Sequence, residues 1–422
     1  FGISRVRVPQ VPEPFSWNPA REVWRGASEM LRDRVLLLSI TGISFFWFLG
    51  TLLQMDLLLF AKNTMHMSES GAGILIAGLA VGIAVGSLLA GRISGDHIEI
   101  GLVAPGCFGM GLSALAVVWA APSFPLTLTA LMFLGMFGGF FIVPLNALLQ
   151  HHPAEEEKGR ALGTNNFFNG AAMLMAAVVF WVLTNRIEWS GAHVIFAAGC
   201  FTIASTLIVL WFTPEPTSRY LLTLLVRGIY RFQIRGASHV PANGAALLVA
   251  NHVSFVDGFL IGACLPRLAR FLIMDTWYNR FRLVLKPIGA IPVPLGGRRA
   301  VLESIASARR ALEAGELVCI FPEGSITRTG NMQHFQRGME KIVEGLNVPV
   351  IPVHLGGVWG STFSHAGGSL WRKREKLRRD IQVTFGAPLP SSVKAEEARQ
   401  QVLEMSADAR AREPRVNSTL AR

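Results

Sequence analysis

The sequence predicts a membrane protein in two parts: a six-helix transmembrane bundle followed by an α/β domain. In the first half, six apolar stretches are each long enough to cross a bilayer, which takes about 20 residues. Beyond residue 213, strand-like and helix-like runs alternate, a pattern typical of an α/β sandwich. Charge divides at the same point, because residues 1–213 hold 11 Lys+Arg and 12 Asp+Glu whereas residues 214–422 hold 28 and 16.

The loops between the apolar stretches predict how the bundle is oriented. The six spans are expected at Val35–Phe60, Ala72–Ala90, Ile100–Ala120, Leu126–Leu149, Ala161–Leu183 and Ala192–Phe212. Cations collect before the first span and after the second, fourth and sixth, whereas the alternate loops hold only Lys62 and Arg186. Since Lys and Arg are enriched in cytoplasmic loops, both ends of the bundle should face the cytoplasm. The basic second part then lies beside an anionic leaflet, which favours membrane lipids over nucleic acid as its partner.

Polar side chains within the spans indicate a role beyond anchoring. Spans two and four are rich in glycine, and small residues allow helices to pack closely in lipid. Polar and ionisable groups inside a membrane often line a transport path. The candidates for such a path are Asp56, Asn146, Asn165 and Asn169. For Asp56 the alternative is an interfacial carboxylate near the outer end of a long span, and a purely structural anchor is the least favoured role for the bundle.

Composition divides the chain into five segments. They are a cytoplasmic segment at 1–33, the membrane domain at 34–213, a Pro-Glu-Pro hinge with a basic amphipathic membrane-surface segment at 214–232, the α/β domain at 233–390, and a final helix or linker at 391–422. Within the α/β part, the expected strands are Ala245–Ala250, Leu317–Phe321, Val348–His354 and Ile381–Phe385, and the expected helices are Gly258–Cys264, Ala300–Ala314 and Ala395–Ala407. Because the chain begins with Phe1 and shows no signal-peptide pattern, we expect it to be part of a longer protein.

The residues from Asn251 to Gly258 carry the clearest chemical signal in the chain. They follow a strand and place His252 and Asp257 five positions apart, with Ser254 between them as a turn or capping residue. A carboxylate that accepts from one imidazole nitrogen leaves the other free to take a proton from a hydroxyl. The alternative is a packed histidine with an aspartate at a helix start, since short motifs are only hypotheses.

Three further clusters follow this motif in a fixed order. They are Phe321-Pro322-Glu323-Gly324 with a Thr- and Arg-containing loop after it, Phe335 with Arg337 and Gly338, and the strand Val348–Val353 with its two prolines. Their order and spacing resemble the glycerolipid acyltransferase family, whose pattern is His-x4-Asp, a Gly/Arg block, Phe-Pro-Glu-Gly and a Val-Pro-rich strand. The resemblance covers roughly Arg231 to Leu389.

The resemblance implies a cytoplasmic glycerolipid acyltransferase domain and a role for each motif. His252 would be the general base and Asp257 its orienting group, without a serine acyl-enzyme. The acyl donor would be a thioester of acyl carrier protein or coenzyme A, used as a cosubstrate with no tightly bound cofactor. The residues implied in binding the acceptor or its phosphate are Glu323, Gly324, Arg328, Arg337, Arg298 and Arg299. For each arginine, a solvated surface role is the alternative.

Two departures from the family pattern bear on the acceptor. Ile326 stands where family members that act on lysophosphatidic acid usually carry arginine, and Leu295 ends the second block where arginine is usual. The loss of two cations favours a phosphodiester acceptor over a phosphomonoester. The chain therefore resembles most the 2-acylglycerophosphoethanolamine acyltransferase branch, and lysophosphatidylethanolamine is the expected acceptor. A lysophosphatidic acid acyltransferase is the alternative.

The membrane part resembles the major facilitator superfamily. Gly86–Asp96 is similar to that superfamily's cytoplasmic loop signature between the second and third spans, although Gly91 replaces its usual aspartate. Six spans after a basic segment resemble the carboxyl half of a lysophospholipid transporter, which implies a missing amino-terminal half. The branch also often precedes an acyl-carrier-protein synthetase domain. A facilitator-type transporter with an accessory enzyme is the alternative function.

The implied location is the bacterial inner membrane. The chain would cross it several times, with the enzyme on the cytoplasmic side.

The basic run Trp371–Arg379 is a candidate surface for acidic acyl carrier protein or anionic headgroups, with a solvated helix as the alternative. The four cysteines, Cys107, Cys200, Cys264 and Cys319, lack the spacing of a metal site. We expect them to be reduced packing residues, and we expect no metal.

Overall fold

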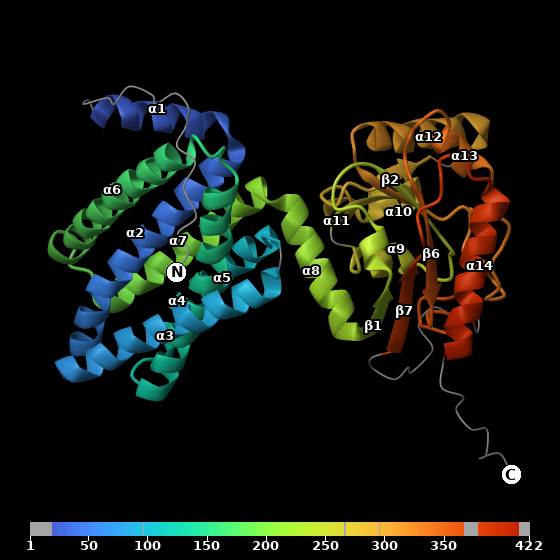
Figure 1. Cartoon of the computed structure of the whole chain (residues 1–422). Coiled ribbons are helices and arrows are strands. Elements are labelled where there is room, and N and C mark those ends of the chain that lie inside the picture. The colour runs from blue at the N-terminus through green and yellow to red at the C-terminus, as the bar shows by residue number, and fades with distance from the viewer. Residues whose placement is uncertain (1–18, 96, 266, 295, 367–378, 413–422) are drawn as a thin grey trace, which may run out of the picture. The chain divides into compact units, whose positions relative to one another are not determined.

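The fold was taken from a computed structural model, which describes residues 19–95, 97–265, 267–294, 296–366 and 379–412. The chain divides into two compact units, residues 1–217 and 218–422 (Figure 1). The first unit is helical throughout its described part, and the second is built on a β-sheet.

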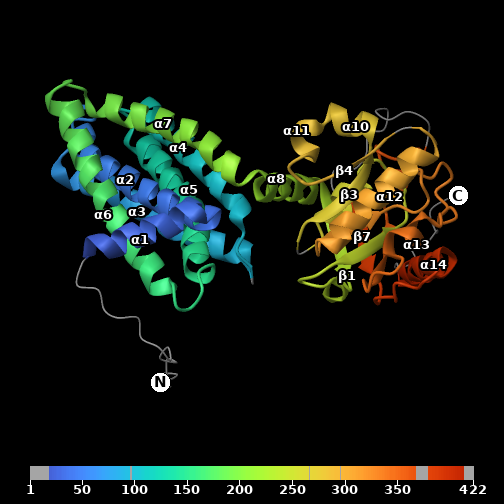
Figure 2. The ribbon, with the colours of Figure 1, turned by 90° about the horizontal axis from the view of Figure 1, so that it is seen from above.

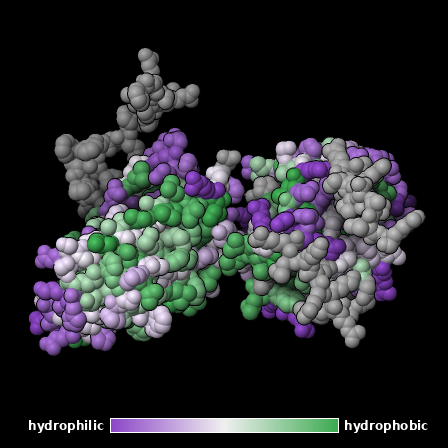
Figure 3. Space-filling view, turned by 90° about the horizontal axis from the view of Figure 1, so that it is seen from below, coloured by the Kyte–Doolittle hydropathy of each residue, from purple (hydrophilic) through white to green (hydrophobic). Residues whose placement is uncertain are grey.

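The first unit contains the predicted membrane spans. Its helices are α1 (Pro19–Arg32), α2 (Arg34–Asn63), α3 (Glu69–Ser94), α4 (Val103–Ala120, after the turn η1 at Ile100–Leu102), α5 (Phe124–His151), α6 (Lys158–Asn185) and α7 (Gly191–Phe212). Among the described residues, six of these segments, α2 to α7, are long and apolar enough to cross a membrane, which confirms the six predicted spans. Figure 3 shows hydrophobic residues over much of the surface of this unit.

Glycines allow α3 and α5 to approach each other at backbone distance. A Cβ atom built on Gly86 would lie 2.0 Å from the carbonyl oxygen of Met136, and one built on Gly139 would lie 2.4 Å from the backbone nitrogen of Ser87. Neither position has room for a side chain. In lipid, where apolar burial does not drive helices together, such close packing is a main source of attraction.

The second unit contains a mostly parallel sheet of seven strands among the described residues. In spatial order they are β1 (Tyr230–Arg235), β7 (Arg379–Phe385), β6 (Val350–Gly356), β2 (Ala246–Ala250), β5 (Leu317–Ile320), β3 (Ala269–Met274) and β4 (Ile291–Val293). Only the β6–β7 pair is antiparallel. The helices are α8 (Pro214–Ile229), α9 (Asp257–Gly262), α10 (Asp275–Arg280), α11 (Arg282–Leu285), α12 (Gly297–Glu313), α13 (Gly338–Val343) and α14 (Ala395–Arg412).

Helices cover both faces of the sheet, so the central strands are buried on both sides. Along β2, Leu248 packs into one core with α9, whereas Leu247 and Val249 pack into the opposite core with α12, α13 and α14. Figure 2 shows these layers from above. Burial on both faces explains why the strands that carry the site are continuous apolar runs. The expected α/β fold is confirmed.

Three features of the second unit differ from the sequence-based expectations. Pro214 and Pro216, expected as a hinge, occupy the first turn of α8, where the missing N–H of proline costs no helical hydrogen bond. Residues 230–232, expected in the membrane-surface segment, begin strand β1. Strands β1, β3 and β4 were not expected from the sequence, because charged residues, or in β4 a proline, interrupt their short apolar runs.

The cysteines follow the prediction in part. Cys107, Cys264 and Cys319 are buried and free, as expected of packing residues, whereas Cys200 on α7 is free but exposed. No group of three or more side chains suited to hold a metal occurs among the described residues. The C-terminal segment forms α14, whose Ala398 and Val402 are fully buried against the sheet.

The contact between α3 and α5 predicts a large difference between two glycines of the same helix. Gly86→Ala should lower the thermal unfolding midpoint of the purified chain in detergent, because its methyl group overlaps the Met136 carbonyl and overpacking costs about 1–3 kcal/mol. Gly91→Ala is the matched control, since nothing lies within 4 Å of its added methyl group. Equal midpoints for the two variants would contradict the close contact.

Candidate active site

The motif at the end of β2 forms a compact turn around the carboxylate of Asp257. This carboxylate is fully buried at the start of α9. Its Oδ2 accepts hydrogen bonds from the Nδ1 of His252 at 2.9 Å and from the backbone nitrogens of Val253 at 2.6 Å and Ser254 at 2.8 Å. Its Oδ1 accepts from the Oγ of Ser254 at 2.5 Å. The buried charge is therefore stabilised by donors from the same turn.

This arrangement sets the tautomer of His252. Because Nδ1 donates its hydrogen to Asp257, the neutral ring carries no proton on Nε2. The His252 side chain remains 20% exposed, whereas Asp257 is not exposed at all. The turn therefore presents an oriented basic nitrogen to an incoming molecule, as the spacing of the two residues predicted.

The Phe-Pro-Glu-Gly loop after β5 holds His252 from the other side. The ring of Phe321 stacks on the His252 imidazole with centroids 4.1 Å apart and planes 15° apart. The backbone nitrogen of Thr327 donates to the carbonyl oxygen of His252 at 2.9 Å. The base is thus fixed through its ring and its backbone, by a loop that lies far from it in the sequence.

Glu323 joins three pieces of backbone. Its Oε1 accepts from the backbone nitrogen of His252 at 2.8 Å, and its Oε2 accepts from that of Gln333, also at 2.8 Å. Burial raises the pKa of the Glu323 carboxyl, while the two N–H groups oppose the shift by favouring the ionised form. Each oxygen accepts one backbone N–H, so Glu323 joins the loops on either side of it, and its expected contact with the acceptor stays a prediction. Gly324, with φ +74°, makes the exposed left-handed turn beside it.

Asn251 fixes the turn to the neighbouring strand β6. Its side-chain amide donates to the carbonyl oxygen of Leu355 at 3.0 Å and accepts from the backbone nitrogen of Leu355 at 2.7 Å. These two hydrogen bonds resemble backbone pairing between strands, and they continue the contact of β2 with β6 beyond the end of β2. Neither this contact nor the Phe321 stacking was predicted from the sequence, although Asn251 directly precedes His252 and Phe321 opens the Phe-Pro-Glu-Gly motif.

The arginines expected to bind phosphate come from separate elements. Arg328 directly follows Thr327 and is exposed, so it extends from the loop that contacts His252. Arg337 and Arg299 are exposed at the starts of α13 and α12, two helices that pack together. The side chain of Arg298 and the residue Leu295 lie outside the described part of the structure, as do residues 371–378 of the basic run.

The path candidates in the first unit differ in exposure. Asp56 and Asn165 are buried inside the bundle, and within the described structure the Asp56 carboxylate and the Asn165 Oδ1 have no hydrogen-bond partner. Asn146 and Asn169 are partly exposed, and Asn169 accepts a hydrogen bond from the Oγ of Ser44 at 3.0 Å. All four stay candidates for a transport path, and Asp56 and Asn165 differ from Asn146 and Asn169 in being buried.

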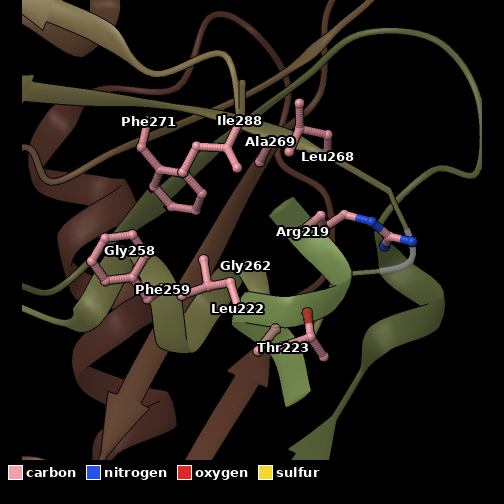
Figure 4. A pocket seen from close by; sticks show the side chains of 11 residues that line it. Arg219, Leu222, Thr223, Gly258, Phe259, Gly262, Leu268, Ala269, Phe271 and Ile288 are labelled. Atoms are coloured by element: carbon pink, nitrogen blue, oxygen red, sulfur yellow. The ribbon is translucent and has the colours of Figure 1, made fainter. Parts of the chain in front are cut away.

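A small apolar pocket of about 30 Å³, partly open to solvent, lies beside α9, the helix that begins with Asp257. Figure 4 shows Phe271 and Ile288 on one side of it and Leu222 and Thr223 of α8 on the other. The Arg227 guanidinium donates to the carbonyl oxygen of Ala263 at 3.0 Å and so ties α8 to this wall. The pocket is well below the usual size of ligand pockets, about 300–1,000 Å³.

The fold and the site together define an acyltransferase joined to a facilitator-type membrane bundle. The Major Facilitator Superfamily profile matches residues 35–285, and the Acyltransferase profile matches residues 231–356. The chain belongs to the Major Facilitator Superfamily, whose profile covers more than half of its residues, and its second unit is an acyltransferase domain. Both predicted resemblances are confirmed.

Individual relatives represent each part. The lysophospholipid transporter LplT of Yersinia enterocolitica is 30% identical over 174 residues (40% of this chain and 42% of that protein), and LplT of Pectobacterium carotovorum is 31% identical over 180 (41% and 43%). The probable 1-acyl-sn-glycerol-3-phosphate acyltransferase of Mycoplasma pneumoniae is 24% identical over 181 residues (40% of this chain and 65% of that protein). The chain thus spans less than half the length of the two transporters. The crystal structure of PlsC, the 1-acyl-sn-glycerophosphate acyltransferase of Thermotoga maritima, matches with a TM-score of 0.38 and 19% identity, covering 48% of this chain and 84% of that one.

The bond between Ser254 and Asp257 predicts that this serine positions the aspartate. Ser254→Ala removes a donor to a buried carboxylate, and hydrogen bonds to charged groups contribute about 1.5–3 kcal/mol. Acyltransfer by the variant should show kcat lowered about tenfold or more with little change in KM, since each 1.4 kcal/mol corresponds to a factor of about ten in rate. Ser307→Ala on the surface of α12 is the control. An unchanged kcat for Ser254→Ala would refute the positioning role.

Proposed function

We propose that the second unit transfers a fatty acyl group from a thioester to the free hydroxyl of a lysophospholipid, with His252 as the general base. The observation that carries this proposal is the bond between His252 Nδ1 and Asp257, which leaves Nε2 unprotonated at an accessible position. The acyltransferase family generally uses acyl thioesters as donors without a tightly bound cofactor, which fits a site built from an imidazole and a carboxylate alone.

The proposed reaction runs in one direct transfer. Nε2 of His252 takes the hydroxyl proton while the oxygen attacks the thioester carbonyl carbon, and Asp257 stabilises the resulting imidazolium. The tetrahedral intermediate collapses, the carbon–sulfur bond breaks, and the proton on Nε2 passes to the departing thiolate. Ser254 is excluded as an acyl carrier by its geometry, because its Oγ is fully buried and directed at Asp257.

Several observations support a lysophospholipid as the acceptor. The enzyme unit shares its chain with six apolar helices, and the transporters similar to this chain are named for lysophospholipids. Ile326 and Leu295 replace two cations of the family pattern, which favours a phosphodiester headgroup such as that of lysophosphatidylethanolamine. Arg328, Arg337, Arg298 and Arg299 remain candidates to contact the phosphate. Lysophosphatidic acid is the competing acceptor, supported by the name of the Mycoplasma relative.

We further propose that the apolar pocket beside α9 marks where an acyl chain enters, and that the pocket, of about 30 Å³, widens to hold the chain. Its walls include Phe259 and Phe271, and it adjoins Gly258, the residue after Asp257. A Cβ atom added to Gly258 would lie 3.2 Å from the Phe271 ring, so a glycine keeps this end of the pocket open.

The basic run Trp371–Arg379 is the proposed docking surface for an acidic acyl carrier protein, with coenzyme A as the other possible form of the donor.

The proposed setting is the inner membrane of a bacterium, with the enzyme unit on the cytoplasmic side. The distribution of Lys and Arg around the spans supports this orientation. We propose that the six helices are the carboxyl half of a lysophospholipid transporter that delivers the acceptor, with Asp56, Asn146, Asn165 and Asn169 as candidates to line its path. An acyl-carrier-protein synthetase domain is the proposed further partner.

The acceptor assignment predicts a specific pattern of activity. Lysophosphatidylethanolamine should be acylated faster than lysophosphatidic acid by the purified chain when acyl thioester is supplied. His252→Ala should lower kcat about 10²–10⁴-fold, the usual contribution of a general base. His334→Ala is the matched control, because that histidine is 88% exposed on the surface. Activity that survives His252→Ala would refute the mechanism, and a preference for lysophosphatidic acid would refute the acceptor.

Transport requires a separate measurement. Proteoliposomes that contain the full-length protein should move labelled lysophospholipid across the bilayer, and Asn169→Leu should slow this movement without lowering acylation of acceptor added on the enzyme side. Transport of unrelated solutes with no movement of lysophospholipid would instead support a general facilitator with an accessory enzyme.

A further inference from the structure

An apolar surface lies on the second unit at α10 and α11, outside the catalytic turn. Leu283 is 93% exposed, Phe281 48% and Trp277 39%. Large apolar side chains that gather on a surface indicate a binding partner, because water-facing surfaces rarely keep them together. Within the second unit, no described element covers Leu283.

Aromatic contacts connect this surface to the turn of the proposed base. The rings of Trp277 and Phe281 stack with centroids 5.9 Å apart and planes 3° apart. Trp277 in turn contacts Phe255, with centroids 5.9 Å apart, and Phe255 lies in the same turn as His252. A row of aromatic rings therefore runs from the catalytic turn to the exposed surface.

The charges around the apolar residues favour an anionic bilayer as the partner. Arg280, Arg282 and Lys286 are exposed in the same segment. Aromatic residues interleaved with Lys and Arg are typical of the membrane interface, where rings sit at headgroup level and cations meet anionic lipids. Of these cations, Lys286 counts against a protein partner, because lysine is depleted at protein–protein interfaces.

Helix α8 carries a second set of exposed apolar residues, which are Leu221, Leu224, Leu225 and Ile229. Helix α8 lines the apolar pocket with Leu222, and the segment after α11 lines it with Ile288 (Figure 4). α8 and the segment that follows α11 therefore meet at this pocket.

We infer that α10 and α11 form a membrane-docking surface that inserts Trp277, Phe281 and Leu283 into the interface of an anionic bilayer. In the docked unit, the turn that contains His252 lies at the level of the lipid headgroups. If the proposed function holds, a lysophospholipid whose chain stays in the bilayer can present its hydroxyl to Nε2 without crossing water. The docking itself does not depend on that function.

Spin labels on the full chain in nanodiscs of phosphatidylethanolamine and phosphatidylglycerol test the docking. Leu283→Cys is labelled in a Cys200→Ser background, because Cys200 is the exposed cysteine and the other three are buried. Gln401→Cys, exposed on α14, is the matched control. The label at 283 should collide with oxygen, which concentrates in lipid, and be shielded from a water-soluble nickel chelate. The label at 401 should show the reverse.

Two results would overturn the docking surface. A label at 283 that the nickel chelate reaches as readily as at 401 would place Leu283 in water. A label reached by neither reagent would place it under a protein, either the membrane unit or another chain.

An activity measurement supplies an independent test. Leu283→Asp should raise KM several-fold for lysophospholipid embedded in nanodiscs, while leaving kcat/KM unchanged for a short-chain lysophospholipid dissolved in water. Gln401→Asp adds the same charge on α14 and should change neither value. Equal effects of Leu283→Asp on both acceptors would contradict docking.

The two proposals can fail separately. If the unmodified chain acylates no lysophospholipid, the proposed function is wrong, but the spin-label result still decides whether the surface docks.

Discussion

The buried carboxylate of Asp257 holds the catalytic turn together, because it accepts the His252 ring, two backbone N–H groups and the Ser254 hydroxyl at once. Removal of the carboxylate would leave these donors unsatisfied in a space that water does not reach, and each such group costs about 1–3 kcal/mol. The same residue begins α9, whose next residue, Gly258, borders the apolar pocket. Asp257 thus orients the base directly, and the helix that it begins forms one wall of the pocket.

The sheet brings the other parts of the site to that carboxylate. Strand β2 lies between β5 and β6, and all three run parallel, so the segments after them meet at one edge. Glu323 and Phe321 reach His252 from the β5 side, and Asn251 reaches β6 through Leu355. Three motifs that are far apart in sequence become one site through strand order. The membrane unit follows a comparable constraint, because the glycines of α3 and α5 allow backbone contact where lipid provides no hydrophobic drive.

Local patterns predicted much of this protein. The six spans, the α/β class and the strands β2, β5, β6 and β7 follow from apolar runs whose length or composition is set by burial in lipid or in a two-sided core. The short strands β1, β3 and β4 escaped prediction, because they gain their stability from neighbours in the sheet and not from their own sequences. Pro214 and Pro216 suggest a hinge by residue type alone, yet proline is also well suited to the first turn of a helix, and α8 begins at Pro214.

The sequence by itself placed His252 and Asp257 close enough to pair, because the two residues follow one strand and lie five positions apart. The tertiary structure decided that they do pair, and it decided the contacts of Glu323, Phe321 and Ser254. Glu323 was expected to meet the acceptor, and the fold adds that its two oxygens also bind backbone N–H groups of His252 and Gln333. A residue type reveals which bonds a side chain can make, but the partner that it finds depends on which loops the strand order brings within about 3 Å.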